Sequence, residues 1–182
     1  MDYKLTQEQV IENSGMINQR LAYIAGPNLS SDLSSDFVII VTDKDSYGFQ
    51  GDVHQDVLEG FPELYSSIET CEVENEELEE ARTRGNQYFF NKGEVISEIF
   101  LVRDSIEGLN DANEPWQYSS DIGIVLRLET GYVAITRLGY HDEMLQVSYF
   151  GELTVENIPA TLGRFETDLH SNYTLTRSFI KA

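Results

Sequence analysis

Hydrophobic residues near the start of the chain follow a helical period. Over residues 6–24, alternating steps of four and three join Val10, Ser14, Ile17, Leu21 and Ile24, of which all but Ser14 are apolar, and this is the spacing of one helical face. Thr6, with Gln9 three residues later, forms a capping-box pattern. The sequence therefore predicts an N-terminal amphipathic helix over 6–24, with an apolar face made by Val10, Ile17, Leu21 and Ile24.

The next segments mix strand and helix signals. The stretch "FVIIVT" at 37–42 is apolar at every other position on both faces, which predicts a strand covered on both sides, and "YGFQG" at 47–51 is expected to pair with it as a hairpin. Pro62 at the start of "PELYSSIE" (62–69) favours a short helix. In "ENEELEEARTRG" (74–85), leading glutamates, closing arginines and a final glycine predict a second helix.

From residue 87 the alternation becomes that of successive strands. "QYFF" (87–90) and "EVISEIFLVR" (94–103) flank "NKG", which predicts a hairpin. "DIGIVLRL" (121–128) alternates so that Ile122, Ile124, Leu126 and Leu128 should share one face. Further strands are expected at 132–138, 144–150 and 173–180, with a short helix near 156–168. The fold class predicted is α+β: one domain over 1–182 with an N-terminal amphipathic helix, a mostly antiparallel meander sheet and short covering helices.

Charge narrows the choice of partners. The 182 residues include 12 Lys and Arg against 32 Asp and Glu, which gives a formal net charge of −20. Nucleic acids and anionic membranes bind basic surfaces, so neither is expected as a direct partner. The charge favours a partner with a basic surface, or none, and the oligomeric state is left open.

The acids concentrate in one part of the chain. No Lys or Arg lies between Lys44 and Arg82. This acidic segment is interpreted either as a solvated face or as a surface that meets a basic partner. If the second helix reaches back to Glu72, like charges four residues apart each cost about 0.2–0.5 kcal/mol, which favours a role outside the fold. The candidate partner-binding residues are Asp45, Asp52, Asp56, Glu59, Glu63, Glu69, Glu72, Glu76, Glu77, Glu80 and the loop residue Trp116.

No motif indicates a catalytic or metal site. Residues 43–54 resemble a calcium loop, but His54 stands where the bidentate glutamate should be, so a hairpin turn is the better interpretation. The three histidines lack metal-site spacing to another His or Cys, and Cys71 lies among carboxylates that disfavour its thiolate. No catalytic residue, metal or cofactor is therefore predicted. Four arginines on predicted strands, expected to form salt bridges in preference to an anion pocket, are Arg103, Arg127, Arg137 and Arg177.

The expected location is the cytoplasm. A single cysteine excludes an intramolecular disulfide, the first residues show no signal-peptide pattern, and the longest apolar run, "FVIIV", is too short to span a bilayer.

The stretch "PWQYSSDIGIVLRLETGYVAITRLG" (115–139), with the closing strand "TRSFI", resembles in general character the immunity proteins of bacterial polymorphic-toxin systems. The resemblance covers mainly residues 95–181. It implies a protein that binds one cognate toxin, expected to be basic, and blocks it. Two alternatives remain open: a DNA mimic, such as an anti-restriction protein, and a small-molecule enzyme whose site is assembled from dispersed residues.

Overall fold

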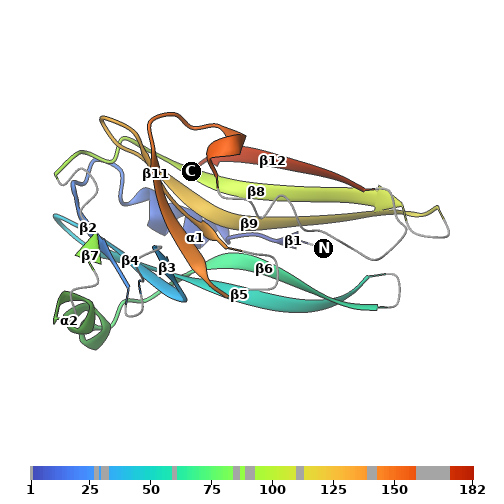
Figure 1. Cartoon of the computed structure of the whole chain (residues 1–182), viewed down its shortest axis with the longest axis horizontal. Coiled ribbons are helices and arrows are strands. Elements are labelled where there is room, and N and C mark those ends of the chain that lie inside the picture. The colour runs from blue at the N-terminus through green and yellow to red at the C-terminus, as the bar shows by residue number, and fades with distance from the viewer. Residues whose placement is uncertain are drawn as a thin grey trace.

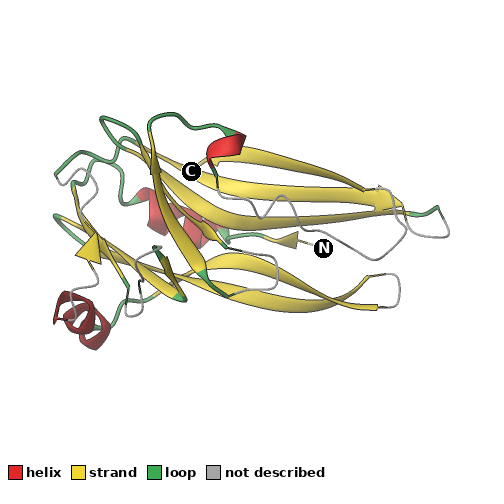
Figure 2. Ribbon diagram, viewed as in Figure 1, coloured by secondary structure: helices red, strands yellow, loops and turns green. Residues whose placement is uncertain are grey.

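Two β-sheets make up most of the described structure, and the helices in the described residues are short (Figures 1 and 2). The computed structural model describes residues 2–26, 29, 33–58, 61–83, 87–88, 93–109, 113–138, 143–158 and 173–182. The helices are α1 (Gln7–Ser14), α2 (Asn75–Thr83) and the 3-10 turn η1 (Val155–Asn157). The strands are β1 (Asp2–Tyr3), β2 (Leu21–Ala25), β3 (Ser34–Ser35), β4 (Phe37–Thr42), β5 (Ser46–Leu58), β6 (Phe61–Cys71), β7 (Gln87–Tyr88), β8 (Glu98–Leu109), β9 (Pro115–Arg127), β10 (Tyr132–Arg137), β11 (Leu145–Phe150) and β12 (Tyr173–Lys181).

The strand order separates the expected meander from a second sheet. The first sheet runs β12-β8-β9-β10-β11-β3, and β1 pairs with β9 as its one parallel neighbour in the described chain. The second runs β6-β5-β4-β2-β7. In Figure 1 the long strands of both sheets extend toward the same end of the molecule. The coarse prediction of a mostly antiparallel fold with a few short helices is confirmed.

The main core is built by both sheets. Val38 and Ile40 of β4 are fully buried in it together with Ile124 and Leu126 of β9. The alternate residues Ile39 and Val41 are buried in a smaller cluster, against which Leu78 of α2 packs. The prediction that the strand at 37–42 is covered on both sides is therefore confirmed.

The predicted helix over 6–24 is wrong beyond its first two turns. The capping box of Thr6 and Gln9 is present, but α1 ends at Ser14, and Asn18 takes a left-handed backbone conformation with a φ of 67°. Leu21 and Ile24 are core residues of a strand, β2, whose pairing with β4 shifts register between Leu21 and Tyr23. This irregularity lets apolar residues three apart face the same core, and their spacing therefore imitates a helix. On α1 itself, Ile11 is 63% exposed.

The predicted helix over 62–69 is also wrong, because these residues belong to β6. Cross-strand pairing with β5 runs without interruption from Leu58↔Phe61 to Gly48↔Cys71. Pro62 is tolerated because β6 ends the order of its sheet in the described chain, where a missing N–H need not break a ladder. Buried Ile68 connects the strand to the main core.

The hairpin predicted around "NKG" does not form as expected. Gln87 and Tyr88 pair with β2, whereas the strand that follows, β8, pairs with β9 and β12. Residues 89–92 lie outside the described chain. The two segments therefore belong to different sheets.

The meander β9-β10-β11 and the last strand β12 are confirmed, with one error of detail. Ile122 does not share a face with Ile124, because pairing of β8 with β9 skips it: Val102 faces Gly123 and Arg103 faces Asp121. Ile122 packs in the cluster of Val102, and Ile124 packs in the main core. The extra residue of such a bulge shifts the alternation by one, so side chains before and after it that are two residues apart point to opposite faces.

The remaining predicted helices are confirmed in part. α2 matches the helix predicted at 74–85, although residues 84–86 are outside the described chain. Of the helix expected near 156–168, η1 covers Val155–Asn157, and residues 159–172 are not described. No helix within the described ranges has the length and apolar character needed to cross a membrane.

Salt bridges of three strand arginines lie within the described residues, as expected. Arg103 contacts Asp121 at 2.7 Å, and Arg127 contacts Glu98 at 2.5 Å. Arg177 of β12 binds Asp104 of β8 through two bonds of 2.7 and 2.8 Å, and neither side chain has exposed surface. These partners belong to separate ion pairs, so the arginines do not assemble one anion pocket.

Candidate functional site

The structure separates the acidic segment into different places. Asp45 lies in the β4–β5 turn, Asp52 and Glu69 lie on β5 and β6, and the last acids follow β6 and continue into α2. Glu76, Glu77 and Glu80 are on α2, but Glu72 precedes it, so the expected repulsion of Glu72 along a helix does not apply. Asp56 and Glu63 face each other in the β5–β6 ladder, although their side chains, like the whole of Glu59, are outside the described parts.

The turn at the start of the segment has the structure expected of a hairpin. Asp43 Oδ1 accepts a hydrogen bond of 2.8 Å from the backbone N–H of Arg20. Thr42 Oγ1 accepts from the backbone N–H of Asp45 at 3.0 Å. The calcium-like spacing therefore serves backbone geometry, as predicted.

A cavity beside α2 gathers acids from several parts of the chain. It has a volume of about 470 Å³ and lies where the start of β4, the middle of β5 and the end of β6 meet the approach to α2. Five carboxylates line it and no basic side chain is among its described lining residues: Asp36, Glu72, Glu74, Glu77 and Glu143. We refer to it as the acidic cavity. Two of these acids, Glu72 and Glu77, were predicted to bind a partner, whereas Asp36 and Glu143 lie outside the acidic segment.

The walls of the acidic cavity are held by the fold. Glu77 Oε2 accepts a hydrogen bond of 2.9 Å from the backbone N–H of Glu74, which stabilises the beginning of α2. On the β5 side the lining includes Gly51, and the fully buried guanidinium of Arg137 lies directly against that glycine. A Cβ atom at residue 51 would lie 1.2 Å from Arg137 Nη1, so only glycine leaves this space.

Cys71 at the edge of the acidic cavity is a poor nucleophile, as predicted. Burial raises its pKa, and the negative charges of Glu77, Glu69 and Glu12 raise it further, to about 12. The thiol stays protonated at neutral pH, which disfavours covalent catalysis by this residue.

Trp116 is held within the fold. Its indole lies over Gly108 on the neighbouring strand and packs against the cluster of Ile106 and Tyr118. The ring is partly buried. Packing within the fold accounts for the position of the Trp116 side chain. Its strand, β9, belongs to the first sheet, whereas the strands that line the acidic cavity, β4, β5 and β6, belong to the second.

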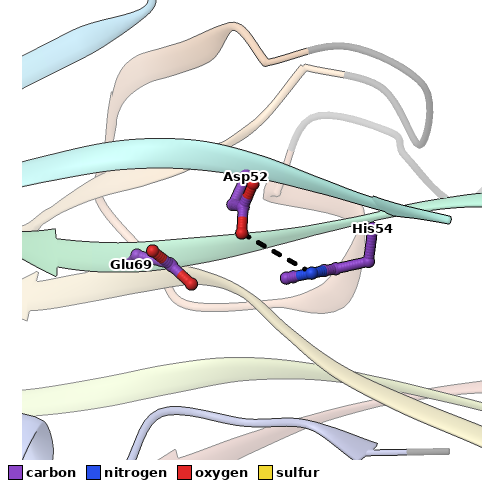
Figure 3. Close-up of side chains that lie close together, drawn as sticks. All are labelled: Asp52, His54 and Glu69. Carbon is purple, nitrogen blue, oxygen red and sulfur yellow. Dashed lines mark ion pairs between the residues drawn. The ribbon is translucent and has the colours of Figure 1, made fainter.

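A second polar cluster lies on β5 and β6 and was missed by the sequence prediction. Asp52 and His54 are two residues apart on β5, and Ser67 and Glu69 are two residues apart on β6, so the members of each pair point to the same face. The register pairs Asp52 with Ser67, so all four side chains share one face of the hairpin, opposite to buried Phe49 and Ile68. Figure 3 shows Asp52, His54 and Glu69 directed toward one another.

The imidazole of His54 is held from three sides. Nε2 is 2.7 Å from Ser67 Oγ, and Nδ1 is 3.5 Å from Asp52 Oδ2. The ring of Tyr3 stacks on it with centroids 4.1 Å apart and planes within 9°. Burial raises the pKa of nearby Glu69, and the charge of Asp52 raises it further. This polar cluster therefore combines a fixed imidazole with two carboxylates that repel each other.

The sequence prediction missed this cluster because it considered only the spacing of each histidine to another His or Cys, whereas the neighbours of His54 are Asp, Glu and Ser. The available signal was Asp52-x-His54, which places both residues on one face of a strand. Its completion by Glu69 depends on the register of β5 with β6, in a region where a helix was predicted.

Comparisons with protein family models, with curated proteins and with solved structures find no match to this chain.

Proposed function

We propose that the protein binds a basic surface of another protein through the acidic cavity and the adjoining face of α2. The observation that carries the proposal is the convergence of five carboxylates from three separate stretches of the chain on one concavity, with no basic side chain among its described lining residues. The class of partner that the immunity-protein resemblance implies is a cognate toxin, which this protein would inhibit in the cytoplasm.

Electrostatics support a basic partner. Four of the five carboxylates are exposed, so an entering Lys or Arg side chain can be attracted by several of them at once. The net charge of −20 adds a long-range attraction that speeds encounter with a positive surface. The guanidinium group suits this cavity because its donors can contact two carboxylates at once.

The geometry favours this function over a DNA mimic. A mimic needs carboxylates spread along an extended surface at phosphate-like intervals of about 3.4 Å. The five acids of the acidic cavity instead surround a concavity, and Glu77 is turned back toward the backbone of Glu74.

Salt-dependent capture by matched variants tests the proposal. The cavity variant is Glu72→Lys/Glu74→Lys, and the control is Glu129→Lys/Glu152→Lys, which changes the same charge at exposed positions away from the cavity lining. Tagged wild type and control should retain the same basic protein from a lysate of the source organism at low salt, and the cavity variant should lose it. Retention should weaken as salt rises above about 0.1 M, because screening shortens the reach of these charges.

The captured protein then allows a direct measurement. At low salt, its association rate constant with the cavity variant should be much smaller than with the wild type. The dissociation rate constant of its complex with the control variant should stay at the wild-type value. Bound partner should also protect Cys71, which lines the same cavity, from alkylation. Equal capture by both variants, or capture that does not depend on salt, would rule out this cavity as the binding site.

A further inference from the structure

The polar cluster on β5 and β6 has the composition of a metal centre. Asp52, His54 and Glu69 each offer one ligand atom, and these atoms lie within 4.8 Å of one another. A tetrahedral zinc ion with bonds of about 2.0–2.2 Å holds its ligands roughly 3.3–3.6 Å apart. The separation of 3.5 Å between His54 Nδ1 and Asp52 Oδ2 already has that value.

The surroundings of His54 are those of a ligand histidine. When Nε2 carries the proton and donates it to Ser67 Oγ, the lone pair of Nδ1 is directed toward Asp52. A hydrogen bond from the second ring nitrogen is what orients metal-binding histidines in proteins. The stacked ring of Tyr3 fixes the plane of the imidazole, so little freedom is lost when a metal binds.

Charge and access also fit. The ligand atoms of Asp52 and Glu69 lie within 4.8 Å of each other, and a divalent cation between the two carboxylates would relieve their mutual repulsion. The side chains of Asp52 and His54 are 44% and 22% exposed, which leaves a path for the ion. A cavity of about 170 Å³, lined in part by His54, Ser67 and Glu69, adjoins the cluster and has room for water ligands.

We propose that Asp52, His54 and Glu69 bind a divalent first-row transition metal ion of the zinc class, with Ser67 and Tyr3 positioning the imidazole. One nitrogen and two carboxylate oxygens suit such an ion. Calcium is disfavoured because it takes six to eight oxygen ligands, and a histidine ligand is foreign to it. Three protein ligands leave at least one coordination position for water or for a group of another molecule. The site is distinct from the acidic cavity and does not depend on the function proposed for it.

The same groups also stand in the order Ser67–His54–Asp52, which is the order of a hydrolytic triad. The metal assignment is favoured because Ser67 is only 4% exposed and lies in the middle of a paired strand, which is a poor position for a nucleophile. Glu69 has no role in a triad, whereas it is the third ligand of a metal site.

Zinc titration by calorimetry, at about 0.15 M salt to screen non-specific binding, tests the proposal. Wild type should bind one Zn²⁺ per chain, and Co²⁺ in its place should give the visible absorption of a low-symmetry, protein-bound ion. His54→Gln, Asp52→Asn and Glu69→Gln should each weaken binding at least tenfold. Ser67→Ala, which removes no charge, should weaken it about 10- to 100-fold.

Controls separate a built site from the general attraction of an acidic protein. Glu129→Gln/Glu152→Gln removes two exposed carboxylates elsewhere and should leave the zinc affinity unchanged. Circular dichroism of the metal-free proteins checks that each variant is folded, and Ser67→Ala with the Co²⁺ spectrum decides the matter if a ligand variant fails to fold. Equal weakening in the control and ligand variants, unchanged affinity in Ser67→Ala, or zinc binding without one-site stoichiometry would overturn the proposal. Labelling of Ser67 by a fluorophosphonate would also overturn it and assign these groups to acyl transfer.

Discussion

The ion pair between Arg177 and Asp104 should dominate the response of the fold to single substitutions on β12. Two hydrogen bonds of 2.7 and 2.8 Å join the side chains, which have no exposed surface, and the residues face each other directly in the β8–β12 ladder. Arg177→Met leaves the carboxylate of Asp104 buried without this partner. Breaking a buried pair in this way costs about 3–5 kcal/mol, because the remaining charge has lost its compensation without regaining water.

Replacing both residues should be much less harmful than replacing one. In Asp104→Leu/Arg177→Met no charge is left behind, and apolar replacements of buried ion pairs are often neutral or stabilising by about 1–4 kcal/mol. The matched control is Lys181→Met on the same strand, where the ion pair with Glu98 is largely exposed and is worth no more than about 1 kcal/mol.

Urea unfolding followed by circular dichroism measures these differences in the free energy of unfolding. In a thermal melt of a protein of this size, each kcal/mol corresponds to about 2–4 °C in Tm, so Arg177→Met should melt roughly 6–20 °C below wild type. The double variant should recover most of that loss. The reasoning would be refuted if Arg177→Met cost no more than Lys181→Met, or if the losses of the two single variants simply added in the double variant.

Two further predictions concern the walls of the acidic cavity. With a pKa near 12 in place of the ordinary 9.0, Cys71 should contain about a thousandfold less thiolate at pH 8. Iodoacetamide should therefore react with Cys71 correspondingly slowly in the wild type, and faster in Glu77→Gln. A wild-type rate like that of free cysteine would contradict this prediction. Gly51→Ala should lower the free energy of unfolding by roughly 2–4 kcal/mol, because the new Cβ displaces the buried guanidinium of Arg137. Gly151→Ala is the control: its new Cβ meets nothing within 4 Å, so it should be nearly neutral in the same urea experiment. Similar values for both variants would show that the space at Gly51 is not restricted.

The sequence predicted those elements in which local pattern and tertiary pairing agree. The capping box of Thr6 and Gln9 begins α1, the glutamate-rich start of α2 matches the helix dipole, and the meander from β9 to β11 follows simple alternation. Two errors have one cause, since irregular pairing at Leu21/Tyr23 and at Ile122 interrupts the period of two that identifies a strand. Another error, at 62–69, shows a long ladder overriding a local helix signal.

The sites depend on contacts that local patterns do not contain. The acidic segment was visible in the sequence, but the acidic cavity also needs Asp36 and Glu143, which the sheets bring to it from distant parts of the chain. The polar cluster needs the exact partner of Asp52 across the ladder, and a shift of one residue would turn Glu69 to the opposite face. Charge could be predicted from composition, whereas the positions of the ligand atoms required register.

The buried guanidinium on β12 also has a consequence for association between chains. β12 is the last strand of its sheet in the described chain, and such edges can slip in register or accept a strand from another molecule. Sliding β12 along β8 by two residues would keep its alternation but would carry Arg177 away from Asp104. A fixed inward charge therefore accepts one alignment and penalises the others, which is a known protection of strand edges against aggregation. The apolar double variant that keeps the stability should lose this protection.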